Sequence, residues 1–164
     1  MRDARRKPVA SLRAAAIRML ARRDYPRAAL ESRLLARGGE PAEVGRTLDE
    51  LERLGYLSDA RFAQALVAQK ADRFGRRAIA HALRERRIEP AVAREALAAL
   101  ANDDEIARAK AVWARRFRAP PADERERARQ IRFLIARGFS AAIALSIVGR
   151  DVAAAEPAPD FDED

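Results

Sequence analysis

Apolar residues recur three and four positions apart along most of this chain, and that spacing predicts helices. In the first such segment, residues 11–23, one face carries Leu12, Ala16, Met19 and Leu20. Eight later segments follow the same period, and no segment shows the strict alternation typical of a half-buried strand. We therefore predict an all-α protein of nine helices.

The residues at the predicted helix ends support this assignment. Pro41 and Pro90 stand where helices begin, a position at which the missing N–H has no helical partner to lose. Ser58 and Ser140 are suited to accept a hydrogen bond from the first turn of the helix that follows each of them. Gly138 is predicted to adopt the left-handed conformation that ends many helices.

The helices belong to an internal repeat. The stretch Tyr25-Pro26-Arg27-Ala28-Ala29-Leu30 is echoed by Phe74-Gly75-Arg76-Arg77-Ala78-Ile79, and residues 36–40 are echoed by residues 136–140. Arg87 stands where the other copies have Gly38 and Gly138, so it must adopt a left-handed conformation or end its helix differently. A fixed period of this length is typical of stacked supersecondary units that present a binding surface.

We predict the following organisation. Three tandem three-helix repeats span residues 11–57, 58–101 and 102–149 and form a curved, elongated array. A basic N-terminal arm (residues 1–10) precedes them, and an acidic, disordered tail (residues 150–164) follows. Asn102 is expected to open the seventh helix, with Glu105 completing a capping box in its first turn.

Composition argues against several functional classes. The chain has 164 residues and no cysteine, which excludes disulfides and thiolate chemistry. No apolar run is long enough for a membrane span, and no apolar core follows the basic N-terminus as a signal peptide would require. We expect a cytoplasmic, monomeric protein. His81, the only histidine, fits a half-exposed structural role, and Trp113, Tyr56 and Phe62 fit core positions. We predict no catalytic residue, metal site or cofactor.

The charge distribution points to a polyanionic partner. The net charge is +8, and residues 151–164 contribute six acids and no base, which leaves +14 on the rest of the chain. A body this basic attracts nucleic acid. The candidate binding residues cluster around the fifth helix and at the end of the seventh: Lys70, Arg73, Arg76, Arg77, Arg84, Arg86, Arg87, Arg115 and Arg116. Around the fifth helix, Arg73, Arg76, Arg77 and Arg84 lie off the Ile79/Leu83 stripe and are expected to project outward.

Three motifs, in this order and spacing, resemble the RecX family, bacterial regulators of the recombinase RecA. They are residues 54–63, Leu-Gly-Tyr-Leu-Ser-Asp-Ala-Arg-Phe-Ala; the spacing of Phe74-Gly75 with Ile79 and Leu83; and residues 137–140, Arg-Gly-Phe-Ser. The resemblance covers roughly residues 11–149. It implies a non-enzymatic protein that binds along the groove of a RecA–DNA filament and inhibits filament growth, ATP hydrolysis, strand exchange and co-protease activity. It also implies some affinity for DNA alone.

Two other functions remain open at this stage. Each three-helix unit has the outline of a helix-turn-helix, so a DNA-binding transcriptional regulator is the alternative. Such a protein reads base edges with polar side chains, but the third helix offers only Thr47 and the sixth offers none. We therefore expect binding to single-stranded and double-stranded DNA without sequence specificity. A protein adaptor whose charge merely keeps it soluble is the third possibility.

Overall fold

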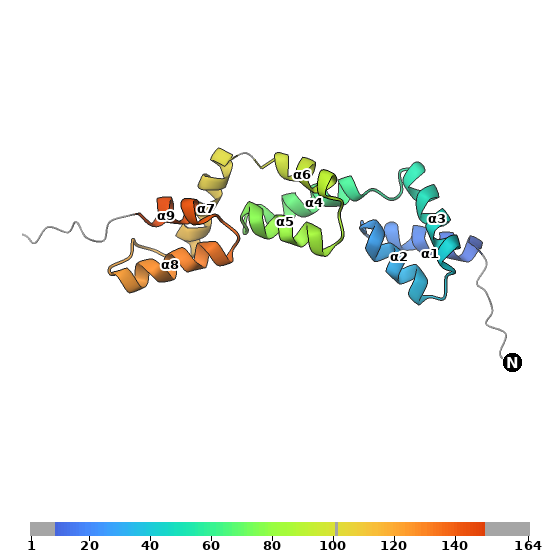
Figure 1. Cartoon of the computed structure of the whole chain (residues 1–164), viewed down its shortest axis with the longest axis horizontal. Coiled ribbons are helices and arrows are strands. Elements are labelled where there is room, and N and C mark those ends of the chain that lie inside the picture. The colour runs from blue at the N-terminus through green and yellow to red at the C-terminus, as the bar shows by residue number, and fades with distance from the viewer. Residues whose placement is uncertain (1–8, 101, 150–164) are drawn as a thin grey trace, which may run out of the picture. The chain divides into compact units, whose positions relative to one another are not determined.

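The computed structural model describes residues 9–100 and 102–149, which form nine helices and no strand (Figure 1). The predicted acidic tail and most of the predicted basic arm lie outside the described residues. The helices are α1 (Val9–Leu20), α2 (Arg27–Ala36), α3 (Pro41–Arg53), α4 (Asp59–Lys70), α5 (Arg76–Glu85), α6 (Pro90–Ala98), α7 (Asn102–Arg116), α8 (Glu124–Ala136) and α9 (Ala141–Val148).

The predicted helix starts at the prolines and the predicted serine caps are confirmed. α3 and α6 begin at Pro41 and Pro90. The Ser58 hydroxyl accepts a hydrogen bond from the Arg61 N–H at 3.1 Å, and the Ser140 hydroxyl accepts one from the Ile143 N–H at 3.2 Å. Each serine thereby satisfies an amide that has no partner within its own helix.

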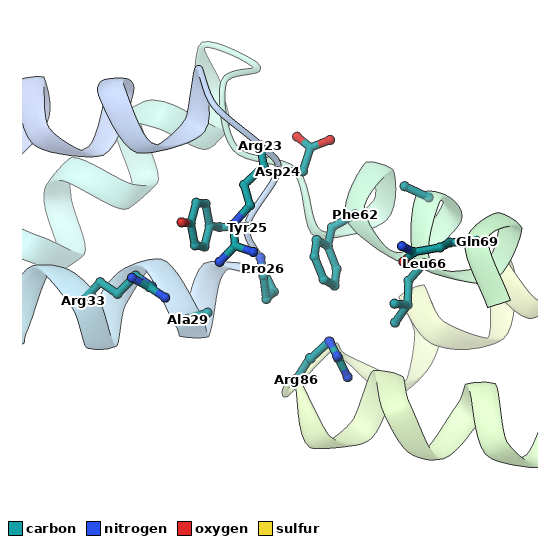
Figure 2. Close-up of a pocket in the computed structure, with 11 residues that line it drawn as sticks. Arg23, Asp24, Tyr25, Pro26, Ala29, Arg33, Phe62, Leu66, Gln69 and Arg86 are labelled. Atoms are coloured by element: carbon teal, nitrogen blue, oxygen red, sulfur yellow. The ribbon is translucent and has the colours of Figure 1, made fainter.

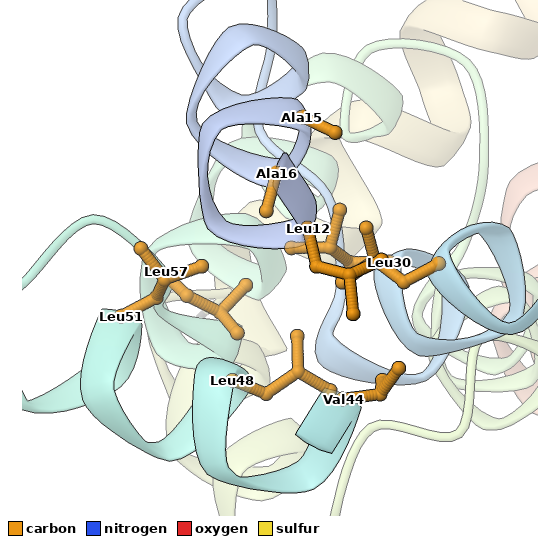
Figure 3. Packing of buried hydrophobic residues seen from close by; sticks show 9 residues of the cluster. Leu12, Ala15, Ala16, Leu30, Val44, Leu48, Leu51 and Leu57 are labelled. Atoms are coloured by element: carbon orange, nitrogen blue, oxygen red, sulfur yellow. The ribbon is translucent and has the colours of Figure 1, made fainter. Parts of the chain in front are cut away.

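The chain divides into two compact units, and the boundary falls inside α5. Unit 1 comprises residues 1–70 and 79–99, and unit 2 comprises residues 71–78 and 100–164. The first three helices of unit 1 enclose a core in which apolar side chains of α1, α2 and α3 point toward one another (Figure 3). Leu30, Val44 and Leu48 are completely buried there.

Unit 2 has a separate core, built from α7, α8 and α9. Phe139 and Leu134 are completely buried at its centre. Trp113 is partly buried against this core, and its indole N–H donates to Gln130 Oε1 at 2.8 Å. Because Gln130 is only 1% exposed, this hydrogen bond satisfies a polar group that water cannot reach.

The middle helix of each of the first two predicted repeats is capped by a carboxylate from the following repeat. Pro26 and Gly75, which precede α2 and α5, have no side chain that could accept a hydrogen bond. The Arg27 N–H donates instead to Asp59 Oδ1 at 2.7 Å, and the Arg76 N–H donates to Glu105 Oε1 at 2.9 Å. Glu105, which was predicted to cap its own helix, thus caps α5 of the preceding repeat.

The third predicted repeat has no repeat after it within the described residues, and its middle helix is capped locally. The Asp123 carboxylate directly before α8 accepts a hydrogen bond from the Glu126 N–H at 2.7 Å. The first-turn amides of the middle helix are therefore capped by a helix of the following repeat in the first two repeats, and by the residue directly before the helix in the third.

Two glycines let backbone meet backbone inside unit 2. The Gly75 N–H donates to the Arg137 carbonyl at 2.8 Å, and the Arg77 N–H donates to the Gly138 carbonyl at 3.2 Å. A Cβ on Gly75 would lie 2.4 Å from the Gly138 oxygen, and one on Gly138 would lie 2.4 Å from the Ala78 Cβ. Only glycine allows this approach, and Gly138 has the predicted positive φ, at 89°.

The corresponding turn in the second predicted repeat ends at Arg87, whose φ is 56°. It is the one non-glycine residue of the described ranges with a positive φ. Of the two conformations that the sequence allowed, Arg87 adopts the left-handed one despite its steric cost.

We predict that Gly138→Ala destabilises unit 2 by about 2–4 kcal/mol, because it adds a left-handed alanine to a clash with α5. The matched control is Gly38→Ala, because Gly38 ends the corresponding helix of the first predicted repeat with the same pattern of backbone hydrogen bonds. Gly38 also has a positive φ, 85°, but a Cβ there would meet nothing within 4 Å. The control should therefore lose only about 1–2 kcal/mol. Urea unfolding followed by far-UV circular dichroism measures both variants, and equal losses would show that the close approach contributes nothing.

Candidate functional site

Unit 2 gathers four arginines around one surface hollow of about 220 Å³. Arg73 comes from the segment before α5, Arg115 and Arg116 come from the last turn of α7, and Arg137 directly follows α8. Val112 and Phe133 provide apolar wall between them. We call these four residues the arginine cluster.

Three members of the arginine cluster are held in place by protein groups. The Arg116 guanidinium lies 5.6 Å from the centre of the Phe117 ring. The Arg115 guanidinium donates from Nη1 to the Asp72 carbonyl at 3.1 Å. The Arg137 guanidinium lies 5.5 Å from the centre of the Phe74 ring and 5.2 Å from that of the Phe133 ring. Stacking of this kind orients a guanidinium and leaves its N–H groups free to bind an anion.

The hollow carries an excess of positive charge, because Asp72 is the only acidic residue, within the described part of the chain, that lines it beside the four arginines. Across residues 9–100 and 102–149, none of its four guanidiniums takes part in an ion pair. Other arginines of unit 2 are neutralised, for example Arg127 by Glu124 at 2.8 Å and Arg129 by Glu126 at 3.1 Å. Helix C-termini carry negative partial charge, which helps α7 and α8 tolerate cations gathered at their ends.

The structure does not bring all nine predicted site residues together. Arg73, Arg115 and Arg116 meet in the arginine cluster. Lys70, Arg84, Arg86 and Arg87 belong to unit 1. The predicted outward projection holds for Arg73, Arg77 and Arg84, which are exposed. It does not hold for Arg76, which is half-buried and donates from Nη1 to the Leu100 carbonyl at 3.2 Å.

Arg137 was not among the predicted site residues. The signal was available, because Arg137 immediately precedes Gly138, the predicted left-handed residue. A side chain next to a sharp turn can lie across the end of its helix. Its proximity to Arg73 and Arg115 depends on tertiary contacts that helical periodicity does not encode.

Unit 1 carries a larger groove, of about 700 Å³, between the start of α2 and the helices α4 and α5 (Figure 2). Its floor includes Pro26, Phe62 and Leu66. Arg23, Arg33 and Arg86 line it as well, and Arg86 is the only predicted site residue among its lining. We call this feature the unit 1 groove.

Two of the three arginines of the unit 1 groove lie against an aromatic ring. The guanidinium carbons of Arg23 and Arg33 lie 4.5 Å and 5.2 Å from the centre of the Tyr25 ring. A hydrogen bond from Arg23 lowers the pKa of Tyr25, and the nearby positive charges act in the same direction. The environment of the phenol is therefore strongly electropositive.

The remaining aromatic and histidine predictions have mixed outcomes. Tyr56 is 50% exposed, so its predicted core position is wrong, and Phe62 is half-buried at the groove. His81 is exposed, and its Nε2 lies 3.3 Å from Oε1 of Glu85, one helical turn away on the surface of α5.

Within the described ranges, no group of three acidic or histidine side chains could hold a metal ion. No helix there is long and apolar enough to cross a bilayer.

Relatives and family profiles agree on one assignment. Family profiles described as the second and third three-helix domains of RecX match residues 58–97 and 103–148. The regulatory protein RecX of Leptothrix cholodnii is 40% identical over 87% of this chain and 90% of its own length. That of Ralstonia nicotianae is 42% identical over 84% of this chain and 86% of its own length.

Solved structures show the same fold. The crystal structure of RecX from Lactobacillus salivarius superposes with a TM-score of 0.75, at 19% identity, over 85% of this chain and 94% of that one. A second structure, of a regulatory protein RecX, gives a TM-score of 0.76 over 85% of this chain. With an all-α repeat fold and relatives at this identity along most of its length, this chain is a member of the RecX family of regulatory proteins.

Proposed function

We propose that this protein regulates RecA by binding the RecA–DNA filament, and that the arginine cluster of unit 2 contacts DNA phosphates there. The observation that carries the proposal is the convergence of Arg73, Arg115, Arg116 and Arg137 on one hollow without an ion pair among the described residues. Membership of the RecX family supports RecA as the partner.

Guanidinium chemistry suits this role. Each guanidinium presents N–H donors in a planar fork that matches two oxygens of one phosphate. Phosphate oxygens recur along a nucleic-acid backbone, so a surface with several such forks binds a strand whatever its base sequence. The protein would therefore bind single-stranded and double-stranded DNA alike, with modest affinity and without sequence specificity.

Inhibition would follow from occupancy. A helical-repeat protein bound to the filament would block the addition of RecA subunits that filament growth requires. It would also hinder the subunit motions that ATP turnover, strand exchange and co-protease activity require. No chemical step by this protein is needed for that effect. The regulator would be non-enzymatic and would act by the free energy of binding alone.

We expect the full chain to inhibit DNA-dependent ATP hydrolysis by the RecA of its own organism on single-stranded DNA. Titration of this protein into the ATPase assay measures the effect. If far fewer molecules of this protein than of RecA suffice for full inhibition, the protein caps filament ends. If full inhibition needs nearly equal molar amounts, the protein occupies the length of the filament. Unchanged ATPase turnover and strand exchange at saturating protein would refute the proposal.

The arginine cluster is tested with the double variant Arg73→Gln/Arg116→Gln. Each lost phosphate contact should reduce the slope of log affinity against log salt by about 0.7 on single-stranded DNA, or about 1.4 for two. Thermal stability should change by less than about 0.5 kcal/mol, because both side chains are exposed.

The matched control is Arg125→Gln/Arg132→Gln, which removes the same charge from exposed positions on α8. Fluorescence anisotropy of a labelled oligonucleotide across a salt series compares the two double variants. If both reduce the salt slope equally, net charge and not the arginine cluster governs binding.

A further inference from the structure

Two residues at the junction that holds the unit 1 groove differ from their counterparts in unit 2: Pro26 lines the groove, and Arg87 follows the lining residue Arg86. Pro26 occupies the position of Gly75 in the repeat, and Arg87 occupies that of Gly138. In unit 2 the glycine pair brings backbone against backbone. Pro26 has no N–H with which to reproduce the Gly75 hydrogen bond, and Arg87 brings a side chain to the turn. The junction in unit 1 is left open as a groove.

The groove combines an aromatic floor with unpaired cations. Phe62 lies between Pro26 and Leu66 and extends into the open space (Figure 2). Within the described part of the chain, Arg23, Arg33 and Arg86 form no ion pair. Arg86 is oriented by a 2.8 Å hydrogen bond from Nη1 to the Ala82 carbonyl. A flat apolar surface bordered by anion-binding forks matches a nucleotide, which joins an aromatic base to a phosphate.

Asp24 separates this ligand from the main alternative, an acidic peptide. Asp24 lines the groove, and the Arg61 guanidinium donates to its Oδ1 from Nε and from Nη2, both at 3.1 Å. No hydrogen bond among the described residues uses the other oxygen, Oδ2. The side chains of an acidic peptide offer no hydrogen to this oxygen, whereas a base does, through a ring N–H as in thymine or through an exocyclic amine.

We propose that the unit 1 groove binds one unstacked nucleotide of single-stranded DNA, with its base against Phe62 and the flanking phosphates on Arg23, Arg33 and Arg86. The inference rests on the proposed function for DNA binding and adds a preference that the arginine cluster does not supply. In a duplex the bases are stacked and paired, so only a single strand can place a base in the groove.

The test compares two labelled oligonucleotides of equal length, a deoxythymidine 15-mer and a fully abasic 15-mer that keeps the phosphates. The full chain should bind the deoxythymidine strand at least about fivefold more tightly, the contribution expected of one stacked base. Phe62→Leu keeps an apolar side chain but removes the ring. It should abolish this preference and leave affinity for a 15-base-pair duplex unchanged.

Tyr56→Leu is the matched control, because it removes an exposed aromatic ring of unit 1 that does not line the groove. It should leave the base preference intact. Arg33→Gln provides a second variant at an exposed position, should Phe62→Leu fail to fold. It should weaken binding of the deoxythymidine strand and leave duplex affinity nearly unchanged.

Three outcomes would overturn the inference. The base preference could survive Phe62→Leu, or Phe62→Leu could lose affinity equally for both 15-mers. Arg33→Gln could bind the deoxythymidine strand as tightly as the unchanged protein does.

The peptide Glu-Glu-Phe-Glu-Glu tests the alternative ligand. If it displaces the deoxythymidine strand from the full chain but not from Phe62→Leu, the groove binds acidic peptides instead.

The two proposals fail separately. RecA is absent from this assay, so failure here leaves the filament proposal standing. A protein that keeps the base preference but does not inhibit RecA would refute only the filament proposal.

Discussion

The amides at the start of α2 and α5 have no capping side chain directly before them, and the coupling between neighbouring repeats depends on how these amides are satisfied. Arg27 and Arg76 donate their N–H groups to Asp59 and Glu105, each from the first helix of the following predicted repeat. An uncapped helix start costs about 0.5–2 kcal/mol. Both α2 and α5 are therefore stabilised when the first helix of the following repeat is in place, which couples neighbouring repeats through a charged hydrogen bond.

Arg27 shows how this coupling extends into the packing of unit 1. Its guanidinium donates to Asp49 and Glu52 of α3, both at 2.6 Å, while its N–H bonds to Asp59 of α4. Partial burial opposes the charge of Arg27, but these two carboxylates outweigh it and raise the pKa of the side chain. One residue thereby joins the start of α2 to two later helices.

The same supersecondary pattern gives two different surfaces because of a few substitutions at its turns. Where Gly75 and Gly138 occur, backbones meet and Arg137 is drawn toward Arg115 and Arg73. Where Pro26 and Arg87 occur, the junction stays open and exposes Phe62 beside three arginines. The first surface gathers four arginines, with the Phe74 and Phe133 rings beside Arg137. The second places the half-buried Phe62 ring beside its arginines. Divergence between copies of one repeat thus gives one protein two chemically different surfaces.

Much of this could be predicted from the residues alone. Helix number, the starts at Pro41 and Pro90, the serine caps and the left-handed Gly138 are local features, set by backbone sterics and by hydrogen bonds between neighbours in sequence. The basic character of the surface also follows directly from composition. What the residues could not reveal was which arginines meet. Arg76 donates a hydrogen bond to the Leu100 carbonyl, and Arg137 lies in the arginine cluster. Glu105 caps α5, which belongs to the repeat before its own. Each of these outcomes depends on distances between residues remote in sequence, and helical periodicity carries no information about such distances.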